Sequence, residues 1–180
     1  VGNAATNIAF PLVLLMVTVY VTIGSGGSSK FILLQGAGKN DSAGKTVGNS
    51  LMALTISGII LMVVTLIFLQ PLMVLFGAKG ETLELATAYT RIIAIGAPFQ
   101  ILGAGSSMLI RADGSPKYAM ASTLIGAVLN IILDPICIFT LDMGIEGAAI
   151  ATIIGQMVSA VFSLAYFRKF KSVHLKKEYF

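Results

Sequence analysis

Residues 117–141 read KYAMASTLIGAVLNIILDPICIFTL, and after Lys117 a single charged side chain, Asp134, interrupts the apolar run. About 20 consecutive apolar residues cross a bilayer as an α-helix, so this segment is long enough to span one. A charged carboxylate at that depth is costly, and membrane proteins keep such groups where they couple to a proton or an ion. The alternative is a carboxylate near a helix end that reaches the interface or pairs with a neighbour.

The apolar character of this segment recurs along the whole chain. Of the 180 residues, 56% are hydrophobic and 11% are charged, whereas soluble domains average about 25% charged residues. Because α-helices satisfy their own backbone hydrogen bonds in hydrocarbon without closing a barrel, we expect an all-α integral membrane protein. The sequence predicts a polytopic bundle with five transmembrane helices, at about 4–34, 46–75, 82–110, 117–141 and 147–168.

The basic residues predict how these helices are oriented. Two of the 12 lysines and arginines, Lys79 and Arg91, fall on one side of the predicted membrane, and the other ten fall on the opposite side. By the positive-inside rule, the basic side is cytoplasmic. Five of the ten lie in 168–177, which predicts contact with anionic lipid headgroups rather than with nucleic acid. The chain begins at Val1 without an initiator methionine, so we expect a fragment.

Few residue types for catalysis or cofactor binding are present. Cys137 and His174 are the only cysteine and the only histidine, which excludes an internal disulfide and cysteine- or histidine-rich metal sites. No second buried acid accompanies Asp134 in the predicted spans. We therefore expect no enzymatic activity and no cofactor beyond a coupling ion.

The last two predicted helices form an antiparallel hairpin whose turn centres near Met143. Asp134 lies nine residues before that centre and Thr152 nine residues after it, while Asn130 and Gln156 each lie thirteen residues away. Residues four apart share a helix face, so these four side chains are predicted to form a polar patch. Carboxylate, amide and hydroxyl oxygens suit Na⁺ or a proton. An interhelical hydrogen-bond cluster, worth about 1 kcal/mol per contact, fits the same geometry.

Two further patterns concern packing. Pro98 is predicted to kink the third span, because proline removes one backbone hydrogen bond. Small residues that let helices approach closely in lipid form a stripe at a spacing of four, namely Gly147, Ala151, Gly155, Ser159 and Ser163.

Short motifs in a fixed order give the chain a family resemblance. They are Ala9-Phe10-Pro11, Leu34-Gln35-Gly36-Ala37-Gly38, Leu75-Phe76-Gly77-Ala78, Tyr89-Thr90-Arg91-Ile92, Arg111-Ala112-Asp113-Gly114-Ser115-Pro116, Leu129-Asn130-Ile131-Ile132-Leu133-Asp134-Pro135 and Gly147-Ala148-Ala149-Ile150-Ala151-Thr152. With these motifs the chain resembles the bacterial multidrug and toxic compound extrusion (MATE) transporters.

The resemblance implies a twelve-helix exporter of two six-helix lobes around a central cavity. Residues 1–180 would be part of the amino-terminal lobe, its second to sixth helices, with the first helix and the carboxyl-terminal lobe outside the chain. It also implies that Asn130, Asp134 and Thr152 help to form a cation site, one that could hold Na⁺. Gln156, which only the position in the hairpin selects, is a weaker supporting residue. The expected activity is Na⁺- or H⁺-coupled antiport of cationic or amphipathic drugs across the bacterial cytoplasmic membrane.

Two other functions fit parts of the sequence. A flippase for a lipid-linked precursor or polysaccharide belongs to the same superfamily, but it should line its cavity with Arg or Lys, and no cationic residue lies in the middle of a predicted span. A membrane scaffold or truncated subunit without transport activity is the other alternative.

Overall fold

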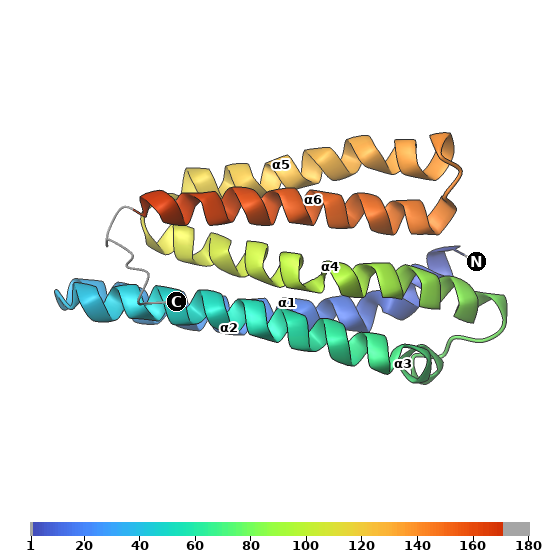
Figure 1. Ribbon diagram of the computed structural model, residues 1–180, viewed down its shortest axis with the longest axis horizontal. Coiled ribbons are helices and arrows are strands. Elements are labelled where there is room, and N and C mark those ends of the chain that lie inside the picture. The colour runs from blue at the N-terminus through green and yellow to red at the C-terminus, as the bar shows by residue number, and fades with distance from the viewer. Residues whose placement is uncertain (1, 171–180) are drawn as a thin grey trace.

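The computed structural model describes residues 2–170 of the chain, and Figure 1 shows their arrangement as a bundle of long helices. In chain order the elements are α1 (Gly2–Gly36), α2 (Asn40–Ile67), α3 (Leu69–Leu75), α4 (Glu81–Ala112), α5 (Pro116–Pro135), the π-helical segment η1 (Ile136–Thr140), α6 (Gly144–Tyr166) and the short 3-10 segment η2 (Phe167–Lys169). His174 and the lysines of 171–177 lie outside the described residues.

The prediction of an all-α bundle with five membrane-spanning helices is confirmed. Five helical segments of the described chain are long and apolar enough to cross a membrane, namely Ala4–Gly36, Asn40–Ile67, Glu81–Ala112, Pro116–Thr140 and Gly144–Lys169. Pro98 lies inside α4 and does not end it, since the helix continues to Ala112.

The second predicted helix, 46–75, is wrong in its boundaries. It begins earlier, at Asn40, and it is divided into α2 and α3 at Phe68, whose φ of −101° and ψ of 22° are not helical. Pro71 explains the break, because its ring clashes with the carbonyl group four residues earlier. That residue is Ile67, where α2 ends.

Helix α4 is the centre of the bundle. It packs against α1, α2 and α6, and α5 packs mainly against α6. Figure 1 shows α4 between a layer formed by α5 and α6 and a layer formed by α1 and α2. In an 18-residue apolar stretch of α4, 56% of the residues are buried, whereas the corresponding share for the segment Pro116–Thr140 is 11%. The part of α5 that is shielded from the surroundings is therefore the side that meets α6 and α4.

Glycines allow α5 and α6 to approach closely. A Cβ atom added to Gly155 would lie 2.6 Å from the carbonyl oxygen of Gly126, and one added to Gly147 would lie 2.6 Å from the carbonyl oxygen of Cys137. Two members of the small-residue stripe of α6 thus form the packing surface that the spacing predicted.

Directly after Asp134, the chain changes from an α-helix to a wider π-helical turn. Pro135 closes the α-helix, and the Leu141 N–H donates to the Ile136 carbonyl at 2.9 Å, five residues back. Such π-helical turns often occur next to functional sites. Here the turn places Cys137 against Gly147 at the start of α6.

At the opposite end, a buried polar contact fastens the α4–α5 turn to α6. The Tyr166 hydroxyl is hydrogen-bonded to Asp113 Oδ2 at 2.7 Å and to Ser115 Oγ at 2.6 Å. Asp113 is 3% exposed, so this carboxylate depends on protein partners rather than on water. The Tyr118 hydroxyl adds a second link by donating to the Phe162 carbonyl at 2.8 Å.

Candidate functional site

Three of the four polar residues predicted to face one another meet between α5 and α6. Asn130 Nδ2 donates to Asp134 Oδ1 at 3.2 Å, one turn along α5, and to Thr152 Oγ1 of α6 at 3.3 Å. All three side chains are half-buried. The register across the hairpin, taken with the i,i+4 spacing, therefore brings Asn130, Asp134 and Thr152 together, and we call them the α5–α6 trio.

The orientation of the Asn130 amide determines what the trio can bind. Its N–H groups face the Asp134 carboxylate and the Thr152 oxygen, and the Thr152 hydroxyl donates to the Ala148 carbonyl at 2.9 Å. This arrangement suits a carboxylate that holds no cation, because Asp134 Oδ1 and Thr152 Oγ1 each accept a hydrogen bond from the Asn130 amide. A cation needs oxygen ligands, so its binding would require the amide to turn and present its oxygen. A proton on Asp134 would favour the same turn, since the protonated acid becomes a donor.

Gln156 takes a different partner. Its Nε2 donates to Gln100 Oε1 of α4 at 3.3 Å, so it links α6 to α4 one turn beyond Thr152, rather than α6 to α5. The sequence argument missed Gln100, because the register of one hairpin says nothing about which α4 residue lies across from it.

Tyr89 of α4 is a further residue near the trio. It is half-buried, and its hydroxyl is close enough to the Asp134 carboxylate for the two groups to interact electrostatically. The motif Tyr89-Thr90-Arg91-Ile92 contained this residue without indicating its role. Its position depends on the packing of α4 against the hairpin, which the local sequence does not encode.

The trio borders a partly open cavity of about 290 Å³ between α4, α5 and α6. Asn130 and Thr152 lie in its wall, as do both residues of the Gln100–Gln156 pair. Its other lining residues are Phe99, Gly103, Ala104, Ser107, Thr123, Gly126, Ala127, Gly155 and Ser159. None of these carries a charge, so the wall combines amides and hydroxyls with small apolar surfaces. The Asp134 carboxylate is connected to this wall through its hydrogen bond with Asn130.

Comparison with known proteins agrees with the arrangement of these helices. The family model described as MatE matches residues 3–136. The chain belongs to the MATE family. The multidrug export protein MepA of Staphylococcus aureus is 35% identical over 167 residues, which cover 92% of this chain and 37% of that protein. MepA of Staphylococcus saprophyticus is 33% identical over 165 residues, covering 91% and 36%.

Solved MATE structures share the fold. One, a MATE protein in the bent conformation, superposes with a TM-score of 0.93 at 30% identity and covers 99% of this chain and 40% of that one. Another, an inward-facing multidrug resistance MATE transporter, gives a TM-score of 0.92 at 31% identity over 99% and 41%. The chain is thus a multi-pass membrane protein of the MATE family, and it spans less than half the length of these relatives.

Proposed function

We propose that this chain is part of an antiporter that exports cationic or amphipathic drugs and is driven by Na⁺ or H⁺. The observation that carries the proposal is that Asn130 both donates to Asp134 and lines the cavity. One amide therefore connects the only acidic side chain in this part of α5 with the space where a substrate would lie.

The trio supports coupling through a single side chain. With Asp134 charged and free of a cation, the Asn130 amide donates toward it and the carboxylate attracts a cationic substrate. When Na⁺ or a proton neutralises Asp134, the Asn130 amide turns. The cavity then loses the negative charge beside it, and Asn130 no longer presents the same groups in the cavity wall. An ion shifts a conformational equilibrium only through different affinities for the two states, and this exchange supplies such a difference.

The lining of the cavity supports the substrate class. Amide and hydroxyl groups beside the Phe99 ring suit a molecule that is partly aromatic and partly polar. No lysine or arginine lines the cavity among the described residues. A flippase that holds a lipid-linked pyrophosphate needs such cations, so drug export is the better supported function.

The complete transporter would need more than this chain. We propose that a further helix of this lobe and a second lobe complete the central cavity, as the family resemblance implies, and that the protein acts in the bacterial cytoplasmic membrane. Its chemistry would be binding and exchange, with no catalytic residue and no cofactor beyond the coupling ion.

Ethidium efflux from vesicles that contain the complete natural protein tests this function. Imposed Na⁺ and H⁺ gradients are applied separately to the wild type, to Asp134→Asn and to Asp142→Asn. The last is a matched control, because the same change falls in the exposed turn before α6, where Asp142 has a φ of 51° that asparagine adopts readily. We expect Asp134→Asn alone to abolish gradient-driven efflux. Full efflux by Asp134→Asn would contradict the coupling role.

A further inference from the structure

A second, separate groove runs between α1 and α2, near the end of the bundle that carries most of the basic residues. It has a volume of about 230 Å³ and is lined by Gly26, Gly27 and Lys30 of α1 and by Thr46, Asn49 and Ser50 of α2. It shares no residue with the cavity between α4, α5 and α6. The proposed transport chemistry therefore does not account for it.

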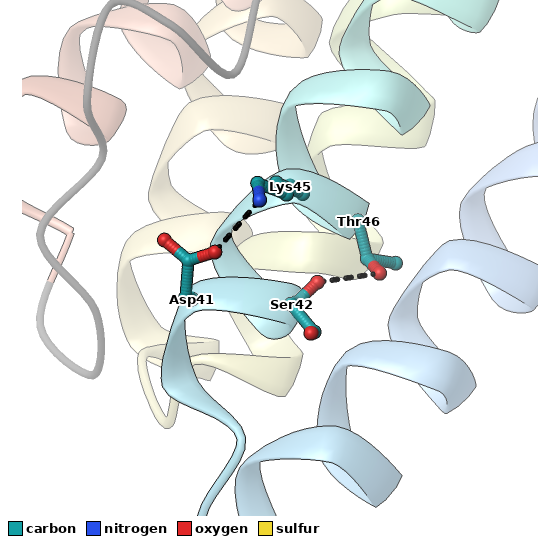
Figure 2. A network of polar contacts seen from close by, with 4 residues as sticks. All are labelled: Asp41, Ser42, Lys45 and Thr46. Carbon is teal, nitrogen blue, oxygen red and sulfur yellow. Dashed lines mark hydrogen bonds and ion pairs between the residues drawn. The ribbon is translucent and has the colours of Figure 1, made fainter.

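The polar groups in this groove favour an anion. The Lys30 ammonium is exposed and has no ion pair within the described part of the chain. Lys45, by contrast, forms an ion pair in which its Nζ lies 2.8 Å from Asp41 Oδ2, a contact drawn in Figure 2. The hydroxyl of Thr46 donates to the carbonyl of Ser42 at 2.9 Å, also drawn in Figure 2.

The remaining hydroxyl is committed in the same way, since Ser50 Oγ donates to the Thr46 carbonyl at 2.8 Å. The groups left to donate to a ligand are the Lys30 ammonium and the exposed amide of Asn49. Together they match a phosphate, which accepts hydrogen bonds and carries negative charge.

Two glycines give the groove its shape. A Cβ atom at Gly27 would overlap the Ser50 side chain, so Ser50 packs directly against the α1 backbone there and closes the groove on that side. A Cβ atom at Gly26 meets nothing within 4 Å. The surface of α1 at Gly26, one turn before Lys30, is therefore open to a ligand.

The depth of the groove matches the lipid headgroups. A helix of 35 residues such as α1 is about 52 Å long at about 1.5 Å per residue, against about 30 Å for the hydrocarbon layer. Each end of α1 then extends about 11 Å beyond the hydrocarbon. Lys30 precedes the last residue, Gly36, by six residues, or about 9 Å, so its backbone lies about 2 Å beyond the hydrocarbon, at the inner edge of the headgroup layer. Its long side chain can extend from there to the headgroup phosphates.

The surface beside the groove is suited to acyl chains. From Asn49 the exposed face of α2 continues toward the hydrocarbon with Met52, Ile56 and Ile60, which are 44%, 51% and 56% exposed. These residues follow one another at steps of three or four, so they share one helix face. A lipid whose phosphate contacts Lys30 could lay its chains along this stripe.

We propose that the α1–α2 groove binds the phosphate of an anionic phospholipid. Lys30 forms the ion pair, Asn49 donates a hydrogen bond, and the acyl chains pack on Met52, Ile56 and Ile60. This site is independent of the trio, so its failure would leave the proposed transport function untouched.

Native mass spectrometry of the complete natural protein in detergent tests the proposal, with phosphatidylglycerol and phosphatidylcholine of equal chain length as probes. Lys30→Gln should weaken phosphatidylglycerol binding about tenfold, as expected for one charge-assisted contact. Lys39→Gln is the matched control, since Lys39 is exposed at the same end but does not line the groove. It should change binding less than twofold.

A steric variant tests the groove without altering charge. In Gly26→Leu, the leucine side chain should fill the open space of the groove and reduce phosphatidylglycerol binding by a factor similar to that of Lys30→Gln. The unfolding temperature and phosphatidylcholine binding should stay unchanged. Equal losses in Lys30→Gln and Lys39→Gln would overturn the site in favour of diffuse surface attraction. Displacement of the lipid by millimolar sn-glycerol 3-phosphate would overturn it in favour of a site for soluble phosphates.

Discussion

A single methyl group at Gly155 should pull the trio apart without changing any of its side chains. The new Cβ atom of Gly155→Ala would lie 2.6 Å from the Gly126 carbonyl oxygen, whereas ordinary contacts begin at 3.4 Å. The two helices must therefore separate by about 0.8 Å there. Thr152 lies one turn from Gly155, so the Asn130–Thr152 distance would grow from 3.3 Å to about 4 Å, beyond hydrogen-bonding range.

We expect two measurable consequences of Gly155→Ala. Overpacking in a close contact costs about 1–3 kcal/mol, which should lower the unfolding temperature of the detergent-solubilised protein. Loss of the Asn130–Thr152 bond should reduce gradient-driven ethidium efflux several-fold, with protein amount in the vesicles held equal.

Gly36→Ala provides the control for this substitution. Its Cβ atom meets nothing within 4 Å, and alanine favours a helix over glycine by up to about 1 kcal/mol, so neither efflux nor stability should fall. If Gly155→Ala keeps the efflux and the unfolding temperature of the wild type, close packing of α5 and α6 does not hold Asn130 and Thr152 at hydrogen-bonding distance, and the reasoning is refuted.

Further substitutions test two contacts elsewhere in the bundle. Tyr166→Phe removes a hydrogen bond to the buried Asp113 carboxylate and should cost about 1–3 kcal/mol of stability, measured as a lower unfolding temperature. The control is Tyr20→Phe, at a half-buried tyrosine of α1 that packs against the apolar core. An equal effect of the two changes would contradict the prediction. Gln100→Leu or Gln156→Leu alone leaves one half-buried amide without its partner and should cost about 1 kcal/mol. The double variant should cost no more than either single one, and additive losses would show that the pair is not coupled.

The part of this structure that the sequence predicts well is the part set by local patterns. Apolar runs long enough to cross a bilayer identified the five spans. The trio followed from two local facts, the i,i+4 spacing of Asn130 and Asp134 and the register of a tight hairpin, because neither depends on the rest of the bundle.

What the sequence did not predict depends on tertiary packing or on proline. Tyr89 and Gln100 face the hairpin only because α4 packs against α6, and nothing in the periodicity of α4 fixes that rotation. The break at Phe68 had a local signal in Pro71, but the apolar run across 46–75 concealed it. Hydropathy measures partition into lipid and does not register the missing backbone donor of a proline.

The central claim, that Asp134 exchanges its coupling ion for the drug, can be tested most directly by ethidium binding to the complete natural protein. The apparent Kd is measured while Na⁺ concentration and pH are varied separately, for the wild type, Asp134→Asn and the control Asp142→Asn. If binding is mutually exclusive, the wild-type Kd should rise up to tenfold for each tenfold increase in the coupling ion. Asp142→Asn should behave like the wild type, and Asp134→Asn should be insensitive to both ions. An unchanged ion dependence in Asp134→Asn would contradict the account.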